Sequence, residues 1–215
     1  MSRLADVWPL ANLTLTTPRL TLRPIRDDDL GPLADAANAG IHDPDFMPFA
    51  RPWTDAEPRT LGREMAKYQW RVRAAAHRED WTINFVVLLD EQPVGSQSLE
   101  ARNFDLLRTV SSGSWLTRSV QGQGLGTEMR AAILLFSFDW LGAEFANSGA
   151  ALGNEASLGV SRRLGYRENG MTRHETRPGV VIDHVELRLA AAEFIRPDWE
   201  LTVTGFEEAG EGLWR

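Results

Sequence analysis

The sequence predicts an α/β (α+β) protein, in which one twisted, mixed sheet of about six or seven strands is flanked by about four helices. Strand-like and helix-like patterns alternate along the chain, with no internal repeat and no long linker. The length of 215 residues suits one domain with a large core. A content of 43% hydrophobic and 25% charged residues is that of an ordinary globular protein. We therefore expect a single domain over residues 1–215, with its core at 13–190 and an extension at 191–215.

The first half of the chain carries a strand, two helices and a strand pair. Alternating apolar and polar residues predict the first strand, and three consecutive aspartates then supply caps and favourable first-turn charge for a helix. Three prolines among large apolar residues make the next stretch an ordered loop. Alternation on both sides of a polar turn predicts a hairpin. The expected elements are a strand at 19–25, a helix at 27–39, a loop at 42–53, a helix from Thr54 or Asp55 to Ala76, and strands at 81–89 and 94–101.

The second half contains a glycine-rich turn followed by a strongly apolar helix. Apolar residues from Met129 to Trp140 recur at helical spacing, so one face of that helix is expected in the core. A later helix should end at Gly165, where glycine relieves a left-handed cap. The expected elements are strands at 110–116, 145–151, 166–175, 180–189 and 201–204, and helices from the turn to Trp140 and from Asn154 to Leu164.

Composition excludes several classes of protein. The chain has no cysteine, which excludes disulfides, thiolate metal ligands and a cysteine nucleophile. Its four histidines form no helical metal-binding pair, so we expect no metal. The net charge of −7 argues against a nucleic-acid partner. No apolar run is long enough to span a bilayer, and the N-terminus lacks the apolar block of a secretory signal, so we expect a cytoplasmic protein with no membrane partner.

The most informative segment is the turn from Gly122 to Gly126, which follows a strand and opens a long helix. Free backbone N–H groups at a helix start, with the positive end of the helix dipole, form an anion site. Three interpretations compete: a plain tight turn, a nucleotide loop, and a cradle for the pyrophosphate of coenzyme A. Neither GxxxxGK[ST] nor GxGxxG at a first strand is present, which disfavours the nucleotide loop. The pattern Q-x-x-G-x-G formed by Gln121, Gly124 and Gly126 fits the cradle.

The helix expected at 154–164 carries a polar and an apolar stripe. Asn154, Ser157 and Ser161 lie at i, i+3 and i+7, so they share one face. Any surface helix shows such stripes, so the pattern alone does not separate a ligand-binding face from a solvated one. The apolar stripe, expected to face the core, consists of Ala156, Val160 and Leu164.

Several motifs stand in order along residues 13–190. They are Thr17-Pro18-Arg19-Leu20-x-Leu22-Arg23-Pro24, Val94-Gly95, Gly113-x-Trp115-Leu116 with Gln121-Gly122-x-Gly124-x-Gly126-Thr127-Glu128, and Asn154-x-Ala156-Ser157-x-x-Val160-x-x-x-Leu164-Gly165-Tyr166. This series resembles the GNAT superfamily of N-acyltransferases, in the branch of the ribosomal-protein-alanine N-acetyltransferases. The stretches 42–49 and 112–116 also resemble a mycobacterial member linked to succinyl-CoA. The resemblance implies the GNAT fold and transfer of an acetyl or succinyl group from a CoA thioester to an amine by direct attack.

The same resemblance implies roles for residues around the glycine turn. The strand before the turn would splay from its neighbour, and the pantetheine arm of CoA would lie in the gap. Backbone groups of Leu116 and Arg118 would hold the arm, with the Leu116 N–H stabilising the thioester oxyanion. Asn154 would bond the pantetheine amide, and Ser157 would donate a proton to the departing thiolate. The implied cofactor-binding residues are Leu116, Arg118, Gln121, Gly122, Gln123, Gly124, Leu125, Gly126, Thr127, Asn154, Ser157 and Ser161.

The general base is less well defined. Many relatives place a glutamate at the position of Ser111, so the usual base is missing here. We take Glu100 as the candidate base, with an ordered water chain as an alternative. The other candidate residues are His174, Glu175 and Asp183.

The binding site for the acceptor is expected at the loop 42–53. His42, Phe49, Arg51 and Trp53 would line an acyl or acceptor pocket, or alternatively clamp a hydrophobic loop onto the core. Arg51 would meet the free carboxylate of a succinyl group. The acidic balance suits a basic acceptor, either a small-molecule amine or a protein or peptide amine.

Two further hypotheses concern function and assembly. Because the usual glutamate is missing, a catalytically weak acyl-CoA sensor or scaffold with the same fold is the alternative to an enzyme. Retention of Asn154 and Ser157 favours the enzyme, for which Arg118 and Arg130 would supply local positive charge. A homodimer that uses the segment Trp199 to Trp214 is the second hypothesis.

Overall fold

The computed structural model describes residues 4–213 and the side chains of residues 4–210. Residues 1–3, 214 and 215 lie outside the described part, and with them Trp214 of the segment proposed for a dimer. No helix within the described part is long and apolar enough to cross a membrane.

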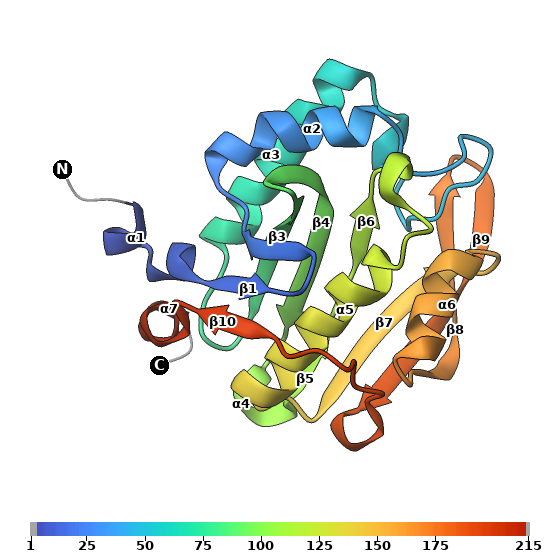
Figure 1. Cartoon of the computed structure of the whole chain (residues 1–215). Helices are drawn as coiled ribbons and strands as arrows, with labels where there is room; N and C mark the ends of the chain where they lie inside the picture. The colour runs from blue at the N-terminus through green and yellow to red at the C-terminus, as the bar shows by residue number, and fades with distance from the viewer. Residues whose placement is uncertain (1–3, 214–215) are drawn as a thin grey trace.

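Ten strands form one mixed sheet, with the spatial order β10-β1-β2-β3-β4-β5-β7-β9-β8 and with β6 paired to β4 (Figure 1). All pairs are antiparallel except β5–β7, which is parallel. The strands are β1 (Thr14–Thr16), β2 (Leu20–Pro24), β3 (Trp81–Leu89), β4 (Gln92–Ala101), β5 (Thr109–Ser111), β6 (Ser114–Leu116), β7 (Phe145–Ala151), β8 (Arg167–Arg177), β9 (Val180–Ala190) and β10 (Thr202–Thr204).

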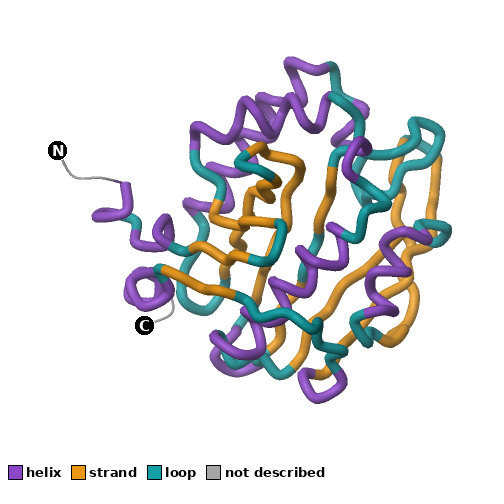
Figure 2. The backbone as a smooth tube through the Cα atoms, viewed as in Figure 1, coloured by secondary structure: helices purple, strands orange, loops and turns teal. Residues whose placement is uncertain are grey.

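Helices pack on both faces of this sheet (Figure 2). Phe85 and Val87 of β3 belong to the main core cluster, which also contains the apolar residues of α5. Val86 and Leu88 point to the other face and pack with Leu33 of α2, as the period of two in a strand requires. The helices are α1 (Leu4–Val7), α2 (Leu30–Asn38), α3 (Pro58–Ala74), α4 (Phe104–Leu107), α5 (Leu125–Leu135, continued by a π turn at Phe136–Trp140), α6 (Glu155–Arg163) and α7 (Phe206–Leu213).

The predicted fold class is confirmed, and the sheet has more strands than expected. The strand predicted at 201–204 exists as β10 and pairs with β1, so residues beyond 190 also belong to the sheet. The second helix begins at Pro58 rather than at Thr54 or Asp55, because proline suits the first helical turn. Elements absent from the prediction, such as β1, α4 and α7, are three to eight residues long and too short to show a period.

The strand predicted at 110–116 is divided into β5 and β6, and this division opens the sheet. Both segments pair with β4 in one unbroken register, from Glu100↔Ser111 to Gly95↔Leu116. Only β5 also pairs with β7, and the last hydrogen bond between them joins the Ser112 N–H to the Asn147 carbonyl at 3.1 Å. Beyond this point β6 and β7 diverge (Figure 1).

Gly95 allows β6 to lie close to β4. A Cβ atom added at Gly95 would stand 2.2 Å from the carbonyl oxygen of Trp115 and 3.0 Å from the Cα of Leu116. Every other residue type would therefore push β6 out of its place, which explains a glycine within this strand.

Candidate active site

The glycine turn before α5 presents a run of free backbone N–H groups. From Gly122 to Gly126, five consecutive N–H groups have no hydrogen-bond partner among the residues that the structure describes. The N–H groups of Gln121 and Thr127, at the two ends, donate to carbonyl oxygens three residues earlier, at 3.2 and 3.1 Å. The cradle predicted over Gln121 to Thr127 is therefore limited to its five central amides.

The conformation of the turn depends on glycine. Gly122 and Gly124 have φ angles of +75° and +82°, in the left-handed region that L side chains disfavour. Gly122, Gln123 and Gly124 are exposed, whereas the Leu125 side chain is 2% exposed and packs in the core, so this residue offers only its N–H group. At this end of α5 the partial positive charge of the helix adds to the free amides. The turn can accept an anion.

A buried carboxylate fixes this turn to the first hairpin. Glu128 accepts hydrogen bonds from the Thr17 hydroxyl at 2.6 Å and from the Arg19 N–H at 2.9 Å. The Arg19 guanidinium pairs with the same carboxylate at 2.6 Å and also donates to the Gln123 carbonyl at 2.9 Å. The motif at 17–20 therefore holds the glycine turn from the neighbouring strands, a role that the sequence pattern did not reveal.

The gap between β6 and β7 is lined by unpaired backbone groups. The Thr117 N–H donates to the Val94 carbonyl at 2.8 Å, so odd-numbered residues of β6 turn their peptide groups toward β4. Ser114 and Leu116 consequently turn theirs toward the gap, and neither N–H has a partner within residues 4–213. The Leu116 N–H therefore has the orientation that its predicted role requires, and the Ser114 N–H, which the sequence reasoning missed, is its equivalent one pleat away.

The opposite wall of the gap belongs to β7. The Leu152 N–H donates to the Asp183 carbonyl at 2.7 Å, so even-numbered residues here bond β9. Gly149 and Ala151 therefore turn their peptide groups toward the gap. Two facing strand edges with free groups can accept an extended, amide-containing chain between them.

Helix α6 lies beside the start of α5 and places two predicted residues near the gap. The Asn154 Oδ1 accepts a hydrogen bond from the Ser157 N–H at 3.2 Å and caps the helix, and its side-chain NH₂ has no partner among the described residues. Ser157 is half-buried in the first turn. A Cβ atom at Gly126 would lie 3.6 Å from Val160, so the two helices meet at that position.

Two predictions for α6 require correction. Ser161 is 0% exposed, and its hydroxyl donates to the Ser157 carbonyl at 3.2 Å, so we remove it from the cofactor-binding set. Ala156, expected in the core, is exposed, and Leu158 is buried instead. The helix is therefore rotated relative to the predicted apolar stripe.

Arg118 and Gln121 form hydrogen bonds within the protein. The Arg118 N–H, predicted to hold the pantetheine arm, donates to the Gly40 carbonyl at 2.9 Å and is not free. The Gln121 side chain donates to the carbonyls of Ile41 and Leu116, both at 2.7 Å. These bonds join the loop between α2 and α3 to the end of β6.

Arg130 forms a buried positive centre at the base of the gap. Its side chain, 4% exposed, donates to the Ser148 hydroxyl of β7 at 2.9 Å and to the Ser114 hydroxyl of β6 at 3.2 Å. The Nε atom has no partner, and no carboxylate pairs with this guanidinium in the described part of the chain. Burial raises the pKa of the nearby Tyr166 phenol, against the effect of the Arg130 charge, so the phenol stays protonated.

The loop between α2 and α3 packs against β6. His42 is held by the Asp43 carbonyl at 2.8 Å and the Thr54 hydroxyl at 2.7 Å, while Phe49 and Trp53 pack in an aromatic series that ends at Trp115. These contacts are those of a loop clamped onto the core, the alternative to a substrate pocket. Arg51 is exposed.

An ion pair joins the same loop to the hairpin β8–β9. The Arg177 guanidinium bonds the Asp55 carboxylate at 2.6 and 2.9 Å, and this hydrogen bonding lowers the pKa of Asp55. Arg177 also donates to the Pro44 carbonyl at 2.9 Å.

The predicted bases have different surroundings. Glu100 lies beyond the closed end of the gap, with a half-exposed side chain 3.7 Å from Arg102, and stays a prediction. Glu175 accepts from the Gly179 N–H at 2.8 Å in the hairpin turn, and Asp183 pairs with Arg173. His174 lies in a polar cluster with His184, their ring centroids 4.7 Å apart.

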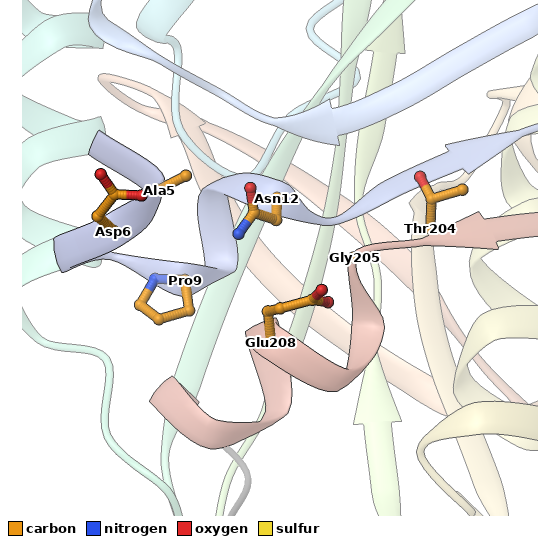
Figure 3. A pocket seen from close by; sticks show the side chains of 7 residues that line it. All are labelled: Ala5, Asp6, Pro9, Asn12, Thr204, Gly205 and Glu208. Atoms are coloured by element: carbon orange, nitrogen blue, oxygen red, sulfur yellow. The ribbon is translucent and has the colours of Figure 1, made fainter. Parts of the chain in front are cut away.

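A large hollow lies away from the glycine turn (Figure 3). Its volume is about 580 Å³, and it is open and lined mainly by polar groups between the N-terminal turns and α7. No group of three or more metal-ligating side chains occurs among the described residues. The lining residues are Ala5, Asp6, Pro9, Asn12, Thr204, Gly205 and Glu208.

Known proteins with similar sequences or folds are acetyltransferases. Residues 19–167 match the family model described as acetyltransferase (GNAT) domain. YdaF of Bacillus subtilis (strain 168), provisionally named a ribosomal N-acetyltransferase, is 26% identical over 93 residues, which are 43% of this chain and only 49% of YdaF. The chain therefore spans about half the length of this relative.

Solved structures share the fold at low sequence identity. Mycobacterium smegmatis RimJ, in complex with CoA-disulfide, has a TM-score of 0.71 at 20% identity, over 96% of this chain and 99% of RimJ. Vibrio cholerae spermidine N-acetyltransferase, in complex with CoA and spermine, has a TM-score of 0.62 at 18% identity, over 82% of this chain and 98% of that protein. Since the family model covers more than half of the sequence, the chain belongs to the GNAT acetyltransferase family.

Proposed function

We propose that this protein transfers an acyl group from a CoA thioester to an amine. The observation that carries the proposal is the run of five free N–H groups from Gly122 to Gly126, at the start of α5 and beside a gap with unpaired strand edges. The diphosphate of CoA would accept from these amides, as anions do at helix starts. Its pantetheine arm would then lie between β6 and β7 as an added strand.

The pantetheine arm would end in the acyl thioester, where the transfer takes place. The amine nitrogen bonds the thioester carbon, and the carbon–sulfur bond breaks after a tetrahedral intermediate. The Leu116 N–H faces the gap, where it would donate to the oxyanion. Ser157 would give a proton to the thiolate, and the NH₂ of Asn154 would bond a pantetheine carbonyl.

The donor acyl group is proposed to be acetyl, with succinyl as the second candidate. A specific feature favours succinyl: Arg130 is a buried cation without a counter-charge next to Ser114, and such a charge is costly. It replaces the exposed Arg51 as the partner for an acyl carboxylate. In Arg130→Gln, a selective loss of kcat/KM for succinyl-CoA would support this assignment, whereas an equal loss for acetyl-CoA would remove it.

The acceptor is proposed to be a cationic amine, either a peptide N-terminus or a polyamine. One relative is named a ribosomal N-acetyltransferase and another a spermidine N-acetyltransferase, and the net charge of −7 attracts cations. Measuring thiol release from acetyl-CoA and succinyl-CoA over a panel of both classes tests the proposal. CoA binding without turnover on any amine would favour the alternative, an acyl-CoA sensor.

The placement of the cofactor has its own test. Gly126→Glu brings a negative charge to the amides without a strained φ, and we expect CoA affinity to fall by about 100-fold or more. Gly124→Glu should do the same but adds backbone strain. Gly31→Glu, in α2 with open space around it, is the matched control. Unchanged affinity in a folded Gly126→Glu protein, measured by calorimetry, would show that the diphosphate binds elsewhere.

A further inference from the structure

A carboxylate lies at the rim of the gap on the sheet face opposite α5 and α6. We call this region the open face and define it by Asn147 and Gly149 of β7 and Glu186 and Arg188 of β9. A Cβ atom at Gly149 would stand 3.6 Å from one oxygen of the Glu186 carboxylate and 3.7 Å from the other. Gly149 itself is exposed although it lies within a paired strand. The missing side chain leaves space directly beside the gap.

The hydrogen bonds of Glu186 leave one of its oxygens available. The Thr172 hydroxyl donates to Glu186 Oε1 at 2.6 Å, and its oxygen lies 3.0 Å from Nε2 of His174. Oε2 has no hydrogen-bond partner, and no arginine or lysine pairs with Glu186 in the described part of the chain. A half-buried carboxylate with one oxygen held and the other free is suited to bind an ammonium group or take a proton.

We propose that the open face is the acceptor-amine subsite and that Glu186 is the general base of the transfer. The inference rests on the proposed function, because it needs a thioester in the gap. The acceptor ammonium would lie above Gly149 and lose a proton to Glu186. The free amine then bonds the thioester carbon from the open face, the carbon–sulfur bond breaks, and the thiolate takes a proton on the opposite side, where α6 carries Ser157.

The proton has a route from Glu186 to solvent. Thr172 links the carboxylate to His174, and Thr172 is exposed on the edge strand β8. The other charged or titratable groups on this face are His184 and Arg188 of β9 and Arg167 of β8, which pairs with Arg188, while β7 offers none. Burial and then the nearby His174 lower the pKa of His184, so this ring is neutral at neutral pH and adds no positive charge beside the carboxylate.

This position also explains why the earlier candidates are less suitable. Glu175 is engaged by the Gly179 N–H, and Asp183 pairs with Arg173 on the other face of the hairpin. Glu100 stands two strands from β7, past the point where β5 and β7 close the gap. Glu186 alone among these carboxylates adjoins the wall of the gap through Gly149.

The test compares Glu186→Gln with the wild-type protein on acceptors that differ in their need for a base. With acetyl-CoA as donor, the probes are spermidine and an alanine-terminated peptide, which are protonated at neutral pH, hydroxylamine, which is not, and water. We expect kcat/KM for the protonated amines and the rate of hydrolysis to fall by about 10²–10⁴-fold. Transfer to hydroxylamine should fall by less than about tenfold, and it should stay nearly independent of pH.

The pH profile gives a second reading. In Glu186→Gln, transfer to the protonated amines should rise about tenfold per pH unit, because it follows the fraction of free amine. The matched control is Glu168→Gln, an exposed glutamate on the same hairpin that lies opposite Leu187, whose side chain is buried on the α5 side. It should keep wild-type rates on every acceptor.

The outcomes separate the two proposals. Wild-type rates for Glu186→Gln on amines and water, or equal losses on all acceptors including hydroxylamine, would overturn the assignment of the base and leave acyl transfer intact. No thiol release by the wild-type protein with any of the four acceptors, despite CoA binding, would overturn acyl transfer itself. Unchanged CoA affinity in Glu186→Gln, by calorimetry, shows that the variant is folded.

Discussion

The network around Glu128 offers a quantitative test of how the glycine turn is held. The carboxylate is 7% exposed and accepts from the Thr17 hydroxyl, the Arg19 N–H and the Arg19 guanidinium, at 2.6 to 2.9 Å. Glu128→Gln keeps one acceptor oxygen for Thr17 and the Arg19 N–H. It replaces the other oxygen by an NH₂ group, so that two hydrogen-bond donors, this NH₂ and the Arg19 guanidinium, face each other.

The expected loss of stability in Glu128→Gln depends on how exposed its partner Arg19 is. A hydrogen bond to a charged group contributes about 1.5–3 kcal/mol. The Arg19 side chain is 47% exposed, so water compensates for part of this loss. We therefore expect Glu128→Gln to lower the free energy of unfolding by about 2 kcal/mol, which for a chain of this length lowers Tm by about 4–8 °C.

A double-mutant cycle isolates the pair. Glu128→Gln, Arg19→Ala and the double variant, unfolded in urea, should give a coupling free energy of about 1–2 kcal/mol. Arg19→Ala also removes the bond from Arg19 to the Gln123 carbonyl, and Glu128→Gln removes the carboxylate that orients the guanidinium, so CoA affinity should fall by a few-fold in each. Additive effects, within about 0.5 kcal/mol, would refute the claim that this ion pair supports the turn.

Three further predictions concern separate parts of the site. Gly95→Ala should destabilise the protein by about 1–3 kcal/mol in urea unfolding and weaken CoA binding, because β6 must move away from the new Cβ; unchanged values for both would contradict the close contact. Burial and the nearby His174 lower the pKa of His184 in the folded protein, so below the ordinary histidine pKa of about 6.5 the unfolded chain binds more protons than the folded one. Stability should therefore fall as pH drops through this value and be constant above it. His184→Phe should remove this part of the pH dependence in urea titrations at several pH values. Asn154→Ala should cost about 1 kcal/mol by loss of the α6 cap, whereas Asn154→Asp should not, as thermal melts would show.

Patterns with a period predicted most of the sheet and helices. Strands of nine to eleven residues, such as β3 and β9, and the helix after the glycine turn gave clear alternation or helical spacing. The division of 110–116 into β5 and β6 has no period to reveal it, because both segments pair with β4 in one register. The two segments differ because β7 pairs with β5 and not with β6, and the sequence of 110–116 does not show where a neighbouring strand stops pairing.

Individual side chains were predicted less well than elements, for physical reasons. Ser161 shares a helix face with Asn154 and Ser157, but a serine can satisfy its hydroxyl on the carbonyl four residues earlier and then be buried. Arg118 offered an N–H group by its place in the chain, and the Gly40 carbonyl, brought there by tertiary structure, takes that group. A spacing rule identifies which groups share a face and cannot identify which are already bonded.

The free groups of the site come from elements far apart in the chain, and they are free for the same reason. The amides of 122–126 lie at a helix start, and the N–H groups of Ser114 and Leu116 lie on a strand edge that loses its partner at Ser112. Free backbone groups beside a core are costly unless water or a ligand bonds them. Glu186 completes this set from a strand that the glycine motif does not reach, because Gly149 brings its carboxylate to the same gap. The geometry therefore places the free amides of the glycine turn, two unpaired strand edges and a carboxylate in series, which is the order in which an acyl-CoA and its acceptor would meet them.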